Sequence, residues 1–593
     1  MMKKRHEPTL KKSRFILVTV IFTGLFLLVA GQAFRIQVLK NDLYTKEAEK
    51  LVSTTQDLVG NRGSILDTHG VPMAMSIDAV KIGIRPHYLP KDKEFDEVRD
   101  KIARITKISW KTKKELKAIF SRSNFTWLNH SAPPEVAEEL LSYVKTLNIP
   151  ENDKKNFVDV FKTSGRVYPH REIAAQLIGF TGTDGHGLEG LEQLYETVLK
   201  GETSQETLIR NRKNGFFNED APLLAENHGK DLVLTIDRHI QFFAENALAE
   251  AAMQAEAESG MAVVMSPKTG EILAMANYPS FNANTPLQYP AEYRRNRVVT
   301  DVFEPGSTLK VFLVAGALEQ KFVEPNSIYY CENGMYNIGP QRIRDTKPHG
   351  WLSVKQIIKY SSNIGSVKIS EALGRENLHQ ILTGFGFGKK TQIDFAGEMG
   401  GLLSHWRRWY PQDTGSIAFG QGISTTALQL VVAASAIANG GKLMQPYLIK
   451  EIRDPVTGEV QKKGPTLVRR VISPETSETV KAMMASVIEA GGTGVQAATY
   501  GYKVAGKTGT SQKQEKDGSY SQTRHIASFL GFAPVKDPEI VVLVVLDEPK
   551  KQQYGGTAAA PAFKKIVSES LAYMHVPPET VTPFTLAMLP KEN

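Results

Sequence analysis

Residues 302–318 read VFEPGSTLKVFLVAGAL, and this stretch contains the first of three short motifs that stand out in the sequence. Proline and glycine at positions 305 and 306 interrupt regular structure, and the apolar run behind them is typical of a helix. The pattern predicts a helix from Ser307 to Leu318. A helix start has backbone N–H groups without partners and carries the positive end of the helix dipole. Ser307 is therefore expected there, with Lys310 one turn further along the same face.

Ser307 and Lys310 are the residue types of a serine nucleophile and its base. A serine needs a base to become nucleophilic, and a lysine that is desolvated beside other cations can be neutral enough to serve. The same S-x-x-K spacing occurs at Ser142 and Lys145, but inside the polar amphipathic segment 134–147, where it predicts a solvent-exposed helix face. Ser307 could also act as a helix cap, but a cap alone does not need Lys310.

Two further short motifs each occur twice, so their context has to decide between the copies. S-x-N occurs at Ser280 and Asn282, in a loop rich in proline and asparagine. It occurs again in Ser361-Ser362-Asn363, which interrupts the helical pattern of residues 354–373 with two hydroxyls and an amide. The second copy is the one we expect to carry chemistry.

The K-T-G motif shows the same contrast. Its copy at residues 268–270 lies in a hairpin turn beside Glu271, whose charge would repel a carboxylate. The copy at residues 507–509 lies in YKVAGKTGTS, residues 502–511, a predicted strand whose small residues would let a substrate backbone lie alongside. One positive charge and two hydroxyls suit a terminal carboxylate, and they come from Lys507, Thr508 and Thr510, with Gly509 between them.

The pattern of predicted elements changes at Asp231. Before it, residues 36–230 are polar and interrupted, which predicts a non-catalytic α+β module. After it, strands are predicted within 232–236, 260–278, 527–532 and 539–546, and helices within 241–254, 307–318, 354–373, 424–438, 474–490 and 561–572. An antiparallel sheet assembled from both ends of this region, with helices inserted, is an α/β sandwich with a helical lobe.

Composition excludes several other classes of protein. The 593 residues are 41% hydrophobic and 23% charged, unlike a disordered chain, collagen or a coiled coil. The single cysteine, Cys331, excludes an intrachain disulfide and a cysteine-based metal cage, and we expect it to be buried and inert. The first 14 residues carry +5 of the net charge of +9, so the remainder does not indicate a nucleic-acid surface. The sequence also lacks H-E-x-x-H, G-x-S-x-G, Walker A and EF-hand motifs.

Residues 15–34, FILVTVIFTGLFLLVAGQAF, contain no charge and would form a helix about 30 Å long, enough to cross a bilayer. A cleaved signal peptide usually has a shorter apolar region followed by a small-x-small site, which this run lacks. The basic residues before it predict a cytoplasmic N-terminus and a large extracytoplasmic body. Val20, Gly24 and Gly31 lie near one face of this predicted helix. Small residues on one face fit either a surface that docks against another membrane helix or a helix that serves only as an anchor.

Taken together, the motifs resemble those of the penicillin-binding transpeptidases. Ser307-Thr-Leu-Lys310, Ser361-Ser-Asn363 and Lys507-Thr-Gly-Thr510 stand in the order and spacing of that family. The surrounding stretches 296–306, 419–426, 491–494 and 554–557 are similar as well. The anchor together with Arg62-Gly63, Asp67, Gly70 and Arg166-x-Tyr168-Pro169 resembles the class B pedestal. Leu309 and Ser511 depart from the residues that are more usual at their positions.

The resemblance implies an α+β protein with one transmembrane helix, an elongated pedestal and a transpeptidase domain in which helices enclose an antiparallel sheet beside an all-helical lobe. The implied boundaries are a basic tail at 1–14, the helix at 15–34, a dimerisation-like pedestal at 35–230, the catalytic domain at 231–575 and a flexible tail at 576–593.

The resemblance also implies a mechanism. Ser307 would attack the penultimate D-Ala carbonyl of a peptidoglycan stem peptide, D-Ala would leave, and the amine of a neighbouring stem would resolve the acyl-enzyme into a cross-link. Lys310 would be the base, Ser361 would relay a proton, and Asn363 would hold the substrate backbone. Lys507, Thr508, Gly509 and Thr510 would bind the terminal carboxylate, and the N–H groups of Ser307 and Thr510 would form the oxyanion hole. No metal or cofactor is implied.

Glu304-Pro-Gly and Asn363 resemble the division-specific type of class B rather than the elongation type. This implies an inner-membrane enzyme with a periplasmic catalytic domain at the septum. The implied partners are stem peptides, β-lactams, a multi-pass division glycan polymerase and other membrane proteins of the division complex. An elongation transpeptidase, a D,D-carboxypeptidase, a β-lactamase and a non-catalytic scaffold are the alternatives.

Overall fold

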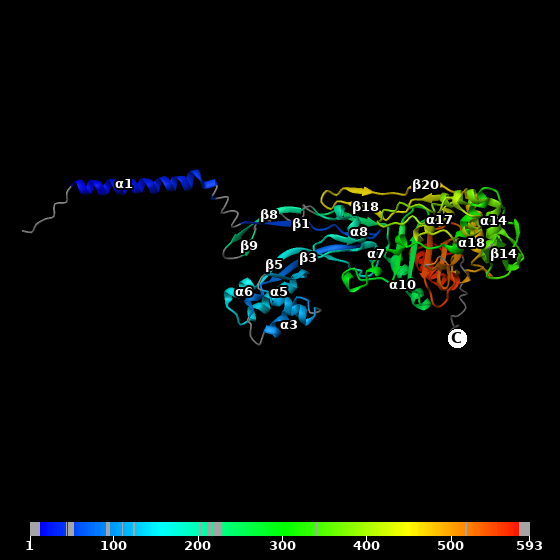
Figure 1. The fold of residues 1–593 in the computed structure, drawn as a ribbon, viewed down its shortest axis with the longest axis horizontal. Helices are drawn as coiled ribbons and strands as arrows, with labels where there is room; N and C mark the ends of the chain where they lie inside the picture. Colours follow the sequence, from blue (N-terminus) through cyan, green and yellow to red (C-terminus); the bar gives the residue numbers. More distant parts are fainter. Residues whose placement is uncertain are drawn as a thin grey trace, which may run out of the picture. The chain divides into compact units, whose positions relative to one another are not determined.

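The computed structural model describes residues 12–42, 44, 53–89, 95–108, 111–122, 125–201, 203–211, 215–217, 228–339, 341–515, 517 and 519–579. Most of the expected basic tail and most of the expected C-terminal tail lie outside these residues. The chain forms two compact units, one of residues 1–60 with 202–227 and one of residues 61–201 with 228–593 (Figure 1).

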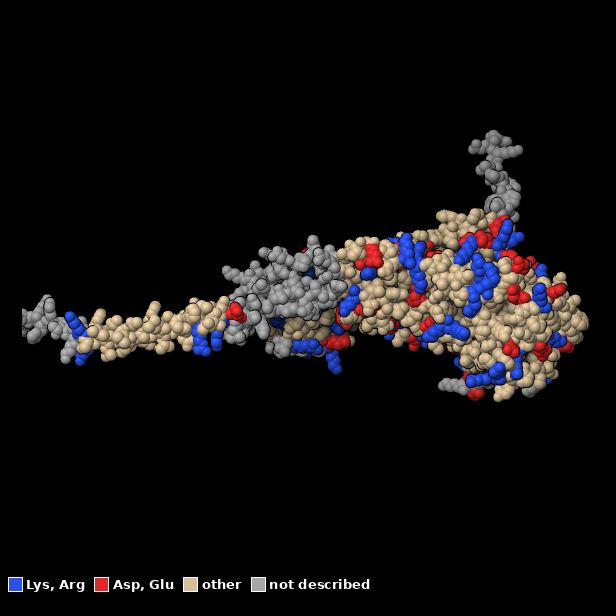
Figure 2. Space-filling model, turned by 90° about the horizontal axis from the view of Figure 1, so that it is seen from above, with Lys and Arg blue, Asp and Glu red and all other residues tan. Residues whose placement is uncertain are grey.

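The first unit contains α1, Lys12–Phe34, which continues as a π-helical turn at Arg35–Leu39. Among the described residues, this is the one helix long and apolar enough to cross a membrane, and its apolar side chains are exposed, as in a single-pass membrane protein. Lys and Arg gather at the two ends of this apolar stretch in Figure 2. β1, Ser53–Val59, pairs antiparallel with β8, Thr203–Asn211, which pairs with β9, Gly215–Phe217.

The second unit is built around a five-stranded antiparallel sheet in the order β12-β11-β23-β22-β21. The strands are β11, Ser259–Met265; β12, Ile272–Tyr278; β21, Ala505–Gln514; β22, Tyr520–Ala533; and β23, Ile540–Asp547. Two of them come from the start of the region that follows Asp231 and three from its end. The predicted sheet assembled from both ends is therefore confirmed.

Helices cover both faces of this sheet, which explains why its central strands are almost continuously apolar. On one face, Val542 and Val544 pack with α10, Arg238–Ala255, and α20, Ala560–Tyr573. On the other face, Val541 and Leu543 pack in the same core as α17, Ala427–Ala438. Alternate residues of a strand point to opposite faces, so one strand supplies both cores.

In the sequence, the helical lobe lies between the two groups of strands that form this sheet. It contains α12, Lys310–Glu319; α13, Val354–Tyr360; α14, Asn363–Leu373; α15, Arg375–Gly384; α16, Pro411–Ala418; and α18, Pro474–Ser486. Small antiparallel pairs lie beside it: β13, Ile328–Tyr330, with β16, Trp351–Ser353; β14, Met335–Ile338, with β15, Gln341–Arg344; and β17, Lys442–Met444, with β20, Leu467–Arg470. Single-turn helices are α11, Arg297–Thr300, and α19, Gly555–Ala558.

Two predicted helices differ from the structure in detail. The helix expected from Ser307 begins as a 3₁₀ turn, η6 at Gly306–Leu309, and becomes α-helical at Lys310. The helical pattern of residues 354–373 is two helices, because Ser361 has a left-handed backbone with φ +59° and ends the first of them. The interruption predicted at this motif is thus a complete break.

The pedestal part of the second unit has its own hydrophobic core, which packs on three strands. β3, Pro72–Ile84, pairs with β5, Val158–Val167, and with β4, Thr126–Ala132. The helices α3, Phe95–Ile105; α4, Lys113–Phe120; α5, Pro134–Thr146; and α6, Glu151–Phe157 supply the rest of that core. Shorter elements are β6, Phe180–Thr181; β7, Gly187–Glu189; α7, Ala175–Ile178; α8, Gly190–Leu194; and α9, Glu196–Leu199.

One sheet connects the pedestal to the region that follows it. β2, Ile65–Leu66, pairs with β3 and runs parallel to β10, Asp231–Leu234. β10 continues the sheet through β18, Ile449–Arg453, to β19, Val460–Lys462. The seven-stranded sheet therefore contains strands of both domains.

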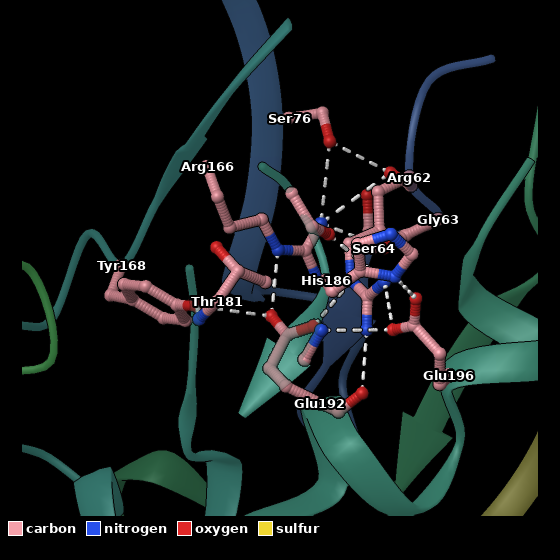
Figure 3. Close-up of polar contacts among 12 residues, drawn as sticks. Arg62, Gly63, Ser64, Ser76, Arg166, Tyr168, Thr181, His186, Glu192 and Glu196 are labelled. Carbon is pink, nitrogen blue, oxygen red and sulfur yellow. Dashed lines mark hydrogen bonds and ion pairs between the residues drawn. The ribbon is translucent and has the colours of Figure 1, made fainter. Parts of the chain in front are cut away.

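The two pedestal motifs noted in the sequence meet at one buried carboxylate, that of Glu192 on α8 (Figure 3). Arg62 donates to it at 2.5 Å, and Arg166 donates to its other oxygen at 2.7 Å. Arg62 also donates to Glu196 at 2.5 Å, and the hydroxyl of Tyr168 lies 3.3 Å from Glu192. These contacts tie the segment before β2 to β5 and α8.

Candidate active site

Ser307 lies in η6, which packs against β21, the strand that carries the second K-T-G motif. Gly306 has a φ of +55°, and Thr308 closes the turn by donating to the carbonyl of Pro305 at 2.7 Å. A Cβ on Gly509 would lie 2.9 Å from Cγ2 of Thr308, so glycine is required where the turn meets the strand. The close packing places the serine beside residues 508–510.

Ser511, one of the two departures from the family pattern, strengthens the same contact. Its hydroxyl donates to the main-chain carbonyl of Glu304 at 2.7 Å. The carboxylate of Glu304 in turn accepts from the N–H of Gly422 at 2.9 Å and the hydroxyl of Tyr520 at 3.0 Å. An alanine at 511 could not make the first of these bonds. The segment before Ser307 is therefore tied to β21 and to the start of β22.

Lys310 is the first residue of α12 and is fully buried. Its Nζ donates to the main-chain carbonyl of Ser361 and to Oδ1 of Asn363, both at 2.6 Å, and lies 3.3 Å from Oγ of Ser361. Among the described residues, the structure shows no hydrogen bond from this amine to the Ser307 hydroxyl in the free protein, where the S-x-N motif accepts from the amine instead.

Lys507 on β21 is also fully buried, and it reaches the same hydroxyl from the other side. Its Nζ donates to Oγ of Ser361 at 2.8 Å and to the carbonyl of Thr508 at 3.0 Å. Oγ of Ser361 therefore lies between two lysine amines, and its own proton is left for another acceptor. The two lysines and the serine bring together the three motifs that the sequence analysis selected.

Burial disfavours the charged form of both lysines, and Lys310 further disfavours a proton on Lys507. Burial lowers the pKa of Lys310 to about 7, with the negative charge of Asp345 acting in the opposite direction. Burial, and then repulsion from Lys310, lowers the pKa of Lys507 well below its ordinary value. Two ammonium groups donating to one buried hydroxyl are disfavoured, so the pair does not keep both protons near neutral pH.

The break between α13 and α14 presents the S-x-N motif. Ser361 is the C-cap of α13, and the hydroxyl of Ser362 accepts from the N–H of Gly365 at 3.0 Å as the N-cap of α14. Asn363 is the first residue of α14, and its amide donates to the carbonyl of Arg344 at 2.8 Å. The helix break therefore fixes the side chains of Ser361 and Asn363 at the amine of Lys310.

The residues of β21 that the sequence analysis assigns to carboxylate binding contact two stretches noted there only as similar to the family. The hydroxyls of Thr508 and Thr493 lie 2.9 Å apart. The N–H of Gly555, at the start of α19, donates to the hydroxyl of Thr510 at 3.2 Å. Thr493 and Gly555 are therefore further residues of the site, and their stretches could be found in the sequence although their contacts could not.

Sequence reasoning missed Asp345, which belongs to none of the three motifs. Its carboxylate accepts from the hydroxyl of Ser362 at 2.6 Å and from the N–H of Asn363 at 2.5 Å. Cys331 is buried, as expected, and its sulfur lies 3.5 Å from the same hydroxyl. Burial raises the pKa of this thiol.

The rejected copies of the motifs lie in other surroundings. Ser142 and Lys145 are exposed on α5. The hydroxyl of Ser280 donates to the main-chain carbonyl of Glu172. Lys268 pairs with Asp537 at 3.0 Å and with Glu539 at 2.6 Å. The structure therefore assembles only one set of the three motifs.

Comparison with known proteins agrees with this geometry. Residues 260–568 match the family described as "Penicillin binding protein transpeptidase domain", and residues 57–234 match "Penicillin-binding Protein dimerisation domain". The chain is 33% identical over 556 residues to "Peptidoglycan D,D-transpeptidase FtsI" of Escherichia coli strain K12, covering 93% of this chain and 90% of that protein. It is 35% identical over 582 residues to "Stage V sporulation protein D" of Bacillus subtilis strain 168, covering 96% and 86%.

A solved structure is similar over most of its length. Penicillin-binding protein 3 of Mycobacterium tuberculosis, complexed with ampicillin, superposes with a TM-score of 0.68 at 26% identity, covering 89% of this chain and 98% of that one. The family indicated by the three motifs is thus confirmed by sequence and by fold. The chain belongs to the class B penicillin-binding proteins, and its catalytic domain is that of a peptidoglycan D,D-transpeptidase.

Proposed function

We propose that this protein cross-links peptidoglycan stem peptides through an acyl-enzyme on Ser307, and that it does so during cell division. The observation that supports the chemistry most strongly is the hydroxyl of Ser361 between the amines of Lys310 and Lys507. This hydroxyl connects Lys310, the proposed base, to Lys507, the cation of the proposed carboxylate site. A scaffold without catalytic activity would gain nothing from burying two lysines around one hydroxyl, because buried charges are costly.

Acylation begins when Lys310, in its neutral form, takes the proton of the Ser307 hydroxyl as the oxygen attacks the penultimate D-Ala carbonyl. The N–H groups of Ser307 and Thr510 stabilise the oxyanion, a contribution of about 10²–10³ in rate for each donor. The C–N bond to the terminal D-Ala then breaks. Ser361 donates its proton to the leaving amine and is resupplied from the lysine pair, so the charges balance.

The second half of the reaction transfers the acyl group. The amine of a neighbouring stem attacks the ester carbonyl and gives its proton to a neutral lysine of the pair. As the C–O bond of the ester breaks, that lysine returns the proton to Oγ of Ser307, which leaves as a hydroxyl. The product is a peptide cross-link, whereas attack by water would give the carboxypeptidase product.

Lys507, Thr508 and Thr510 bind the terminal carboxylate of the donor. A carboxylate that enters beside Lys507 raises the pKa of its amine, because an opposite charge favours the protonated form. The one proton that the two lysines keep between them then stays on Lys507, and Lys310 remains neutral and can act as the base for Ser307. Substrate binding thereby prepares the base.

The second-order rate constant of acylation is expected to fall as the pH drops below about 7. Lys310 acts as a base only when it is neutral, and protonation at lower pH removes that form. The rate constant reports the pKa of the free enzyme, so its acidic limb should have a midpoint near this value. Stopped-flow acylation by a chromogenic cephalosporin between pH 5 and pH 9 measures it; a rate independent of pH through this range would exclude Lys310 as the base.

Lys507→Ala is expected to weaken acylation through recognition of the carboxylate. A hydrogen bond to a charged group contributes about 1.5–3 kcal/mol, which corresponds to roughly 10- to 150-fold in affinity. The matched control is Lys268→Ala, in the other K-T-G motif, where the ammonium pairs with Asp537 and Glu539 instead. Titration with a fluorescent penicillin compares them. Equal acylation constants for wild type and Lys507→Ala would contradict the assignment.

The proposed activity is tested by supplying a pentapeptide donor with a stem peptide that carries a free amine. Transpeptidation gives a cross-linked dimer and free D-Ala, and carboxypeptidation gives a tetrapeptide and D-Ala. We expect the dimer as the main product. Release of D-Ala without any dimer would favour the carboxypeptidase alternative, and no release would favour a scaffold.

The role in division rests on Glu304, Asn363 and the similarity to FtsI. The sporulation relative shows that identity alone does not choose a cellular role. Residues before the pedestal supply the membrane helix, with its stripe of Gly24 and Gly31 available to a multi-pass glycan polymerase. A fluorescently tagged copy is expected at the division site of dividing cells. A copy spread along the side wall would favour the elongation type.

A further inference from the structure

A carboxylate outside the three motifs organises the start of the helix that carries one of them. Asp345 follows β15, and its two oxygens accept from three groups of the first turn of α14. The hydroxyl of Ser362 donates at 2.6 Å, the N–H of Asn363 at 2.5 Å and the N–H of Ile364 at 3.1 Å. The first N–H groups of a helix have no partner within it, and the positive end of the helix dipole favours an anion there.

This helix turn leads directly to the proposed base. Asn363 receives the Asp345 contact through its main-chain N–H and accepts from Lys310 through its side-chain oxygen at 2.6 Å. Its side-chain amide donates to Arg344, the residue before Asp345. Ser361, at the preceding helix end, accepts from Lys310 through its carbonyl and completes the cradle. A movement of the α14 turn would therefore move two of the acceptors that hold the amine.

We propose that Asp345 is a positioning residue for acylation, which fixes the first turn of α14 so that Ser361 and Asn363 hold the amine of Lys310 beside Ser307. The proposal rests on the proposed function, since it assigns Asp345 to the acylation step of that reaction. Asp345 acts through α14 and touches no reacting atom.

Asp345 has an electrostatic effect on the same amine. The charge of Asp345, from the loop after β15, acts on Lys310, and the charge of Lys310 acts on Lys507, from β21. Asp345 raises the pKa of Lys310 and thereby opposes the effect of burial. Removing the charge lowers this pKa, so Lys310 becomes neutral at lower pH. The acidic limb of acylation then moves to lower pH, which loss of structure alone would not cause.

Two substitutions separate the hydrogen bonds that Asp345 accepts from the effect of its charge. Asp345→Asn keeps an oxygen for the two N–H groups and removes the charge. Asp345→Ala removes both, and we expect its maximal acylation rate to fall by on the order of 10²-fold, the effect of a misplaced catalytic group. Asp345→Asn should recover most of this rate and show its acidic limb at lower pH than wild type.

The matched control is Glu319, at the other end of α12. Its carboxylate holds the start of α18 in the same way, accepting from the N–H and hydroxyl of Ser473 at 2.9 Å and 2.8 Å and from the hydroxyl of Thr476 at 2.5 Å. It lies in a helix-capping network that contains none of the proposed catalytic side chains. Glu319→Gln should lower the melting temperature but leave the acylation rate and its pH midpoint unchanged.

The experiment measures acylation of the full-length protein by a fluorescent penicillin from pH 5 to pH 9, with melting temperatures recorded for each variant. A slow Asp345→Ala, together with an Asp345→Asn of shifted midpoint, supports the proposal. Wild-type rates and midpoints in both variants overturn it, as does a Glu319→Gln that is equally slow. An unreactive wild-type protein would contradict the proposed function itself, which separates the two failures.

Discussion

Replacing Ser307 by alanine is expected to abolish covalent labelling by a fluorescent penicillin while the protein stays folded. Oγ of Ser307 is the atom that would form the covalent bond to the penicillin. Loss of the nucleophile in a serine hydrolase costs on the order of 10⁶-fold in rate. The substitution leaves η6 intact, because the bond that closes the turn comes from Thr308 and not from Ser307. Labelling on a gel and a melting curve together measure the two halves of this expectation.

Ser142→Ala is the matched control, since it removes the serine of the other S-x-x-K pair. That serine is exposed on α5 of the pedestal, where its loss should change neither labelling nor stability. If the Ser307→Ala protein still labels and the Ser142→Ala protein does not, the assignment of the nucleophile is wrong.

Lys310→Ala is expected to slow acylation by about 10²–10⁴-fold, the usual contribution of a positioned general base. It should also cost some stability, because the carbonyl of Ser361 and Oδ1 of Asn363 each lose a buried donor at 2.6 Å. Lys310→Arg keeps a positive charge but cannot lose its proton, so it should not restore the rate. Stopped-flow acylation and thermal melting measure the two effects separately.

Lys368→Ala is the control for the loss of a partly buried lysine. Lys368 on α14 donates to the carbonyl of Tyr330 at 2.7 Å and to Glu332 at 2.6 Å, and takes no part in the proposed chemistry. Acylation at the wild-type rate in a folded Lys310→Ala protein would contradict the role of Lys310 as the base.

The sequence alone predicted those features that depend on neighbouring residues in the chain. The breakers before Ser307 predicted a helix start, and the apolar strands at the two ends of the catalytic region predicted its sheet. The copies of each motif could be separated by their neighbours alone, as with Lys268 beside Glu271. The predicted helix start and sheet are confirmed, because they depend on residues close together in the chain.

Contacts between distant residues were not predictable in this way. Lys310 on α12 and Lys507 on β21 both reach Ser361 at the helix break, and the chain separates Lys507 from Ser361 by 146 residues. Arg62 meets Glu192 across 130 residues. Asp345 shows no periodicity or motif, so only the fold connects it to α14.

The S-x-x-K spacing was itself incomplete as a guide to geometry. It predicted Lys310 within reach of Ser307, yet the amine is held by Ser361 and Asn363 in the free protein. A spacing of one helical turn places two residues on one face but does not decide which acceptors the longer side chain selects.

The central claim is that Ser307 carries the acyl group of the donor peptide. The most direct test is mass spectrometry of the protein after brief reaction with a stem pentapeptide ending in D-Ala-D-Ala, followed by digestion to locate the adduct. The account predicts an adduct of the donor lacking its terminal D-Ala, on the peptide that contains Ser307, which disappears when an amine acceptor is added and cross-linked product forms. An adduct on another residue, or cross-linked product formed at the wild-type rate by the Ser307→Ala protein, would contradict it.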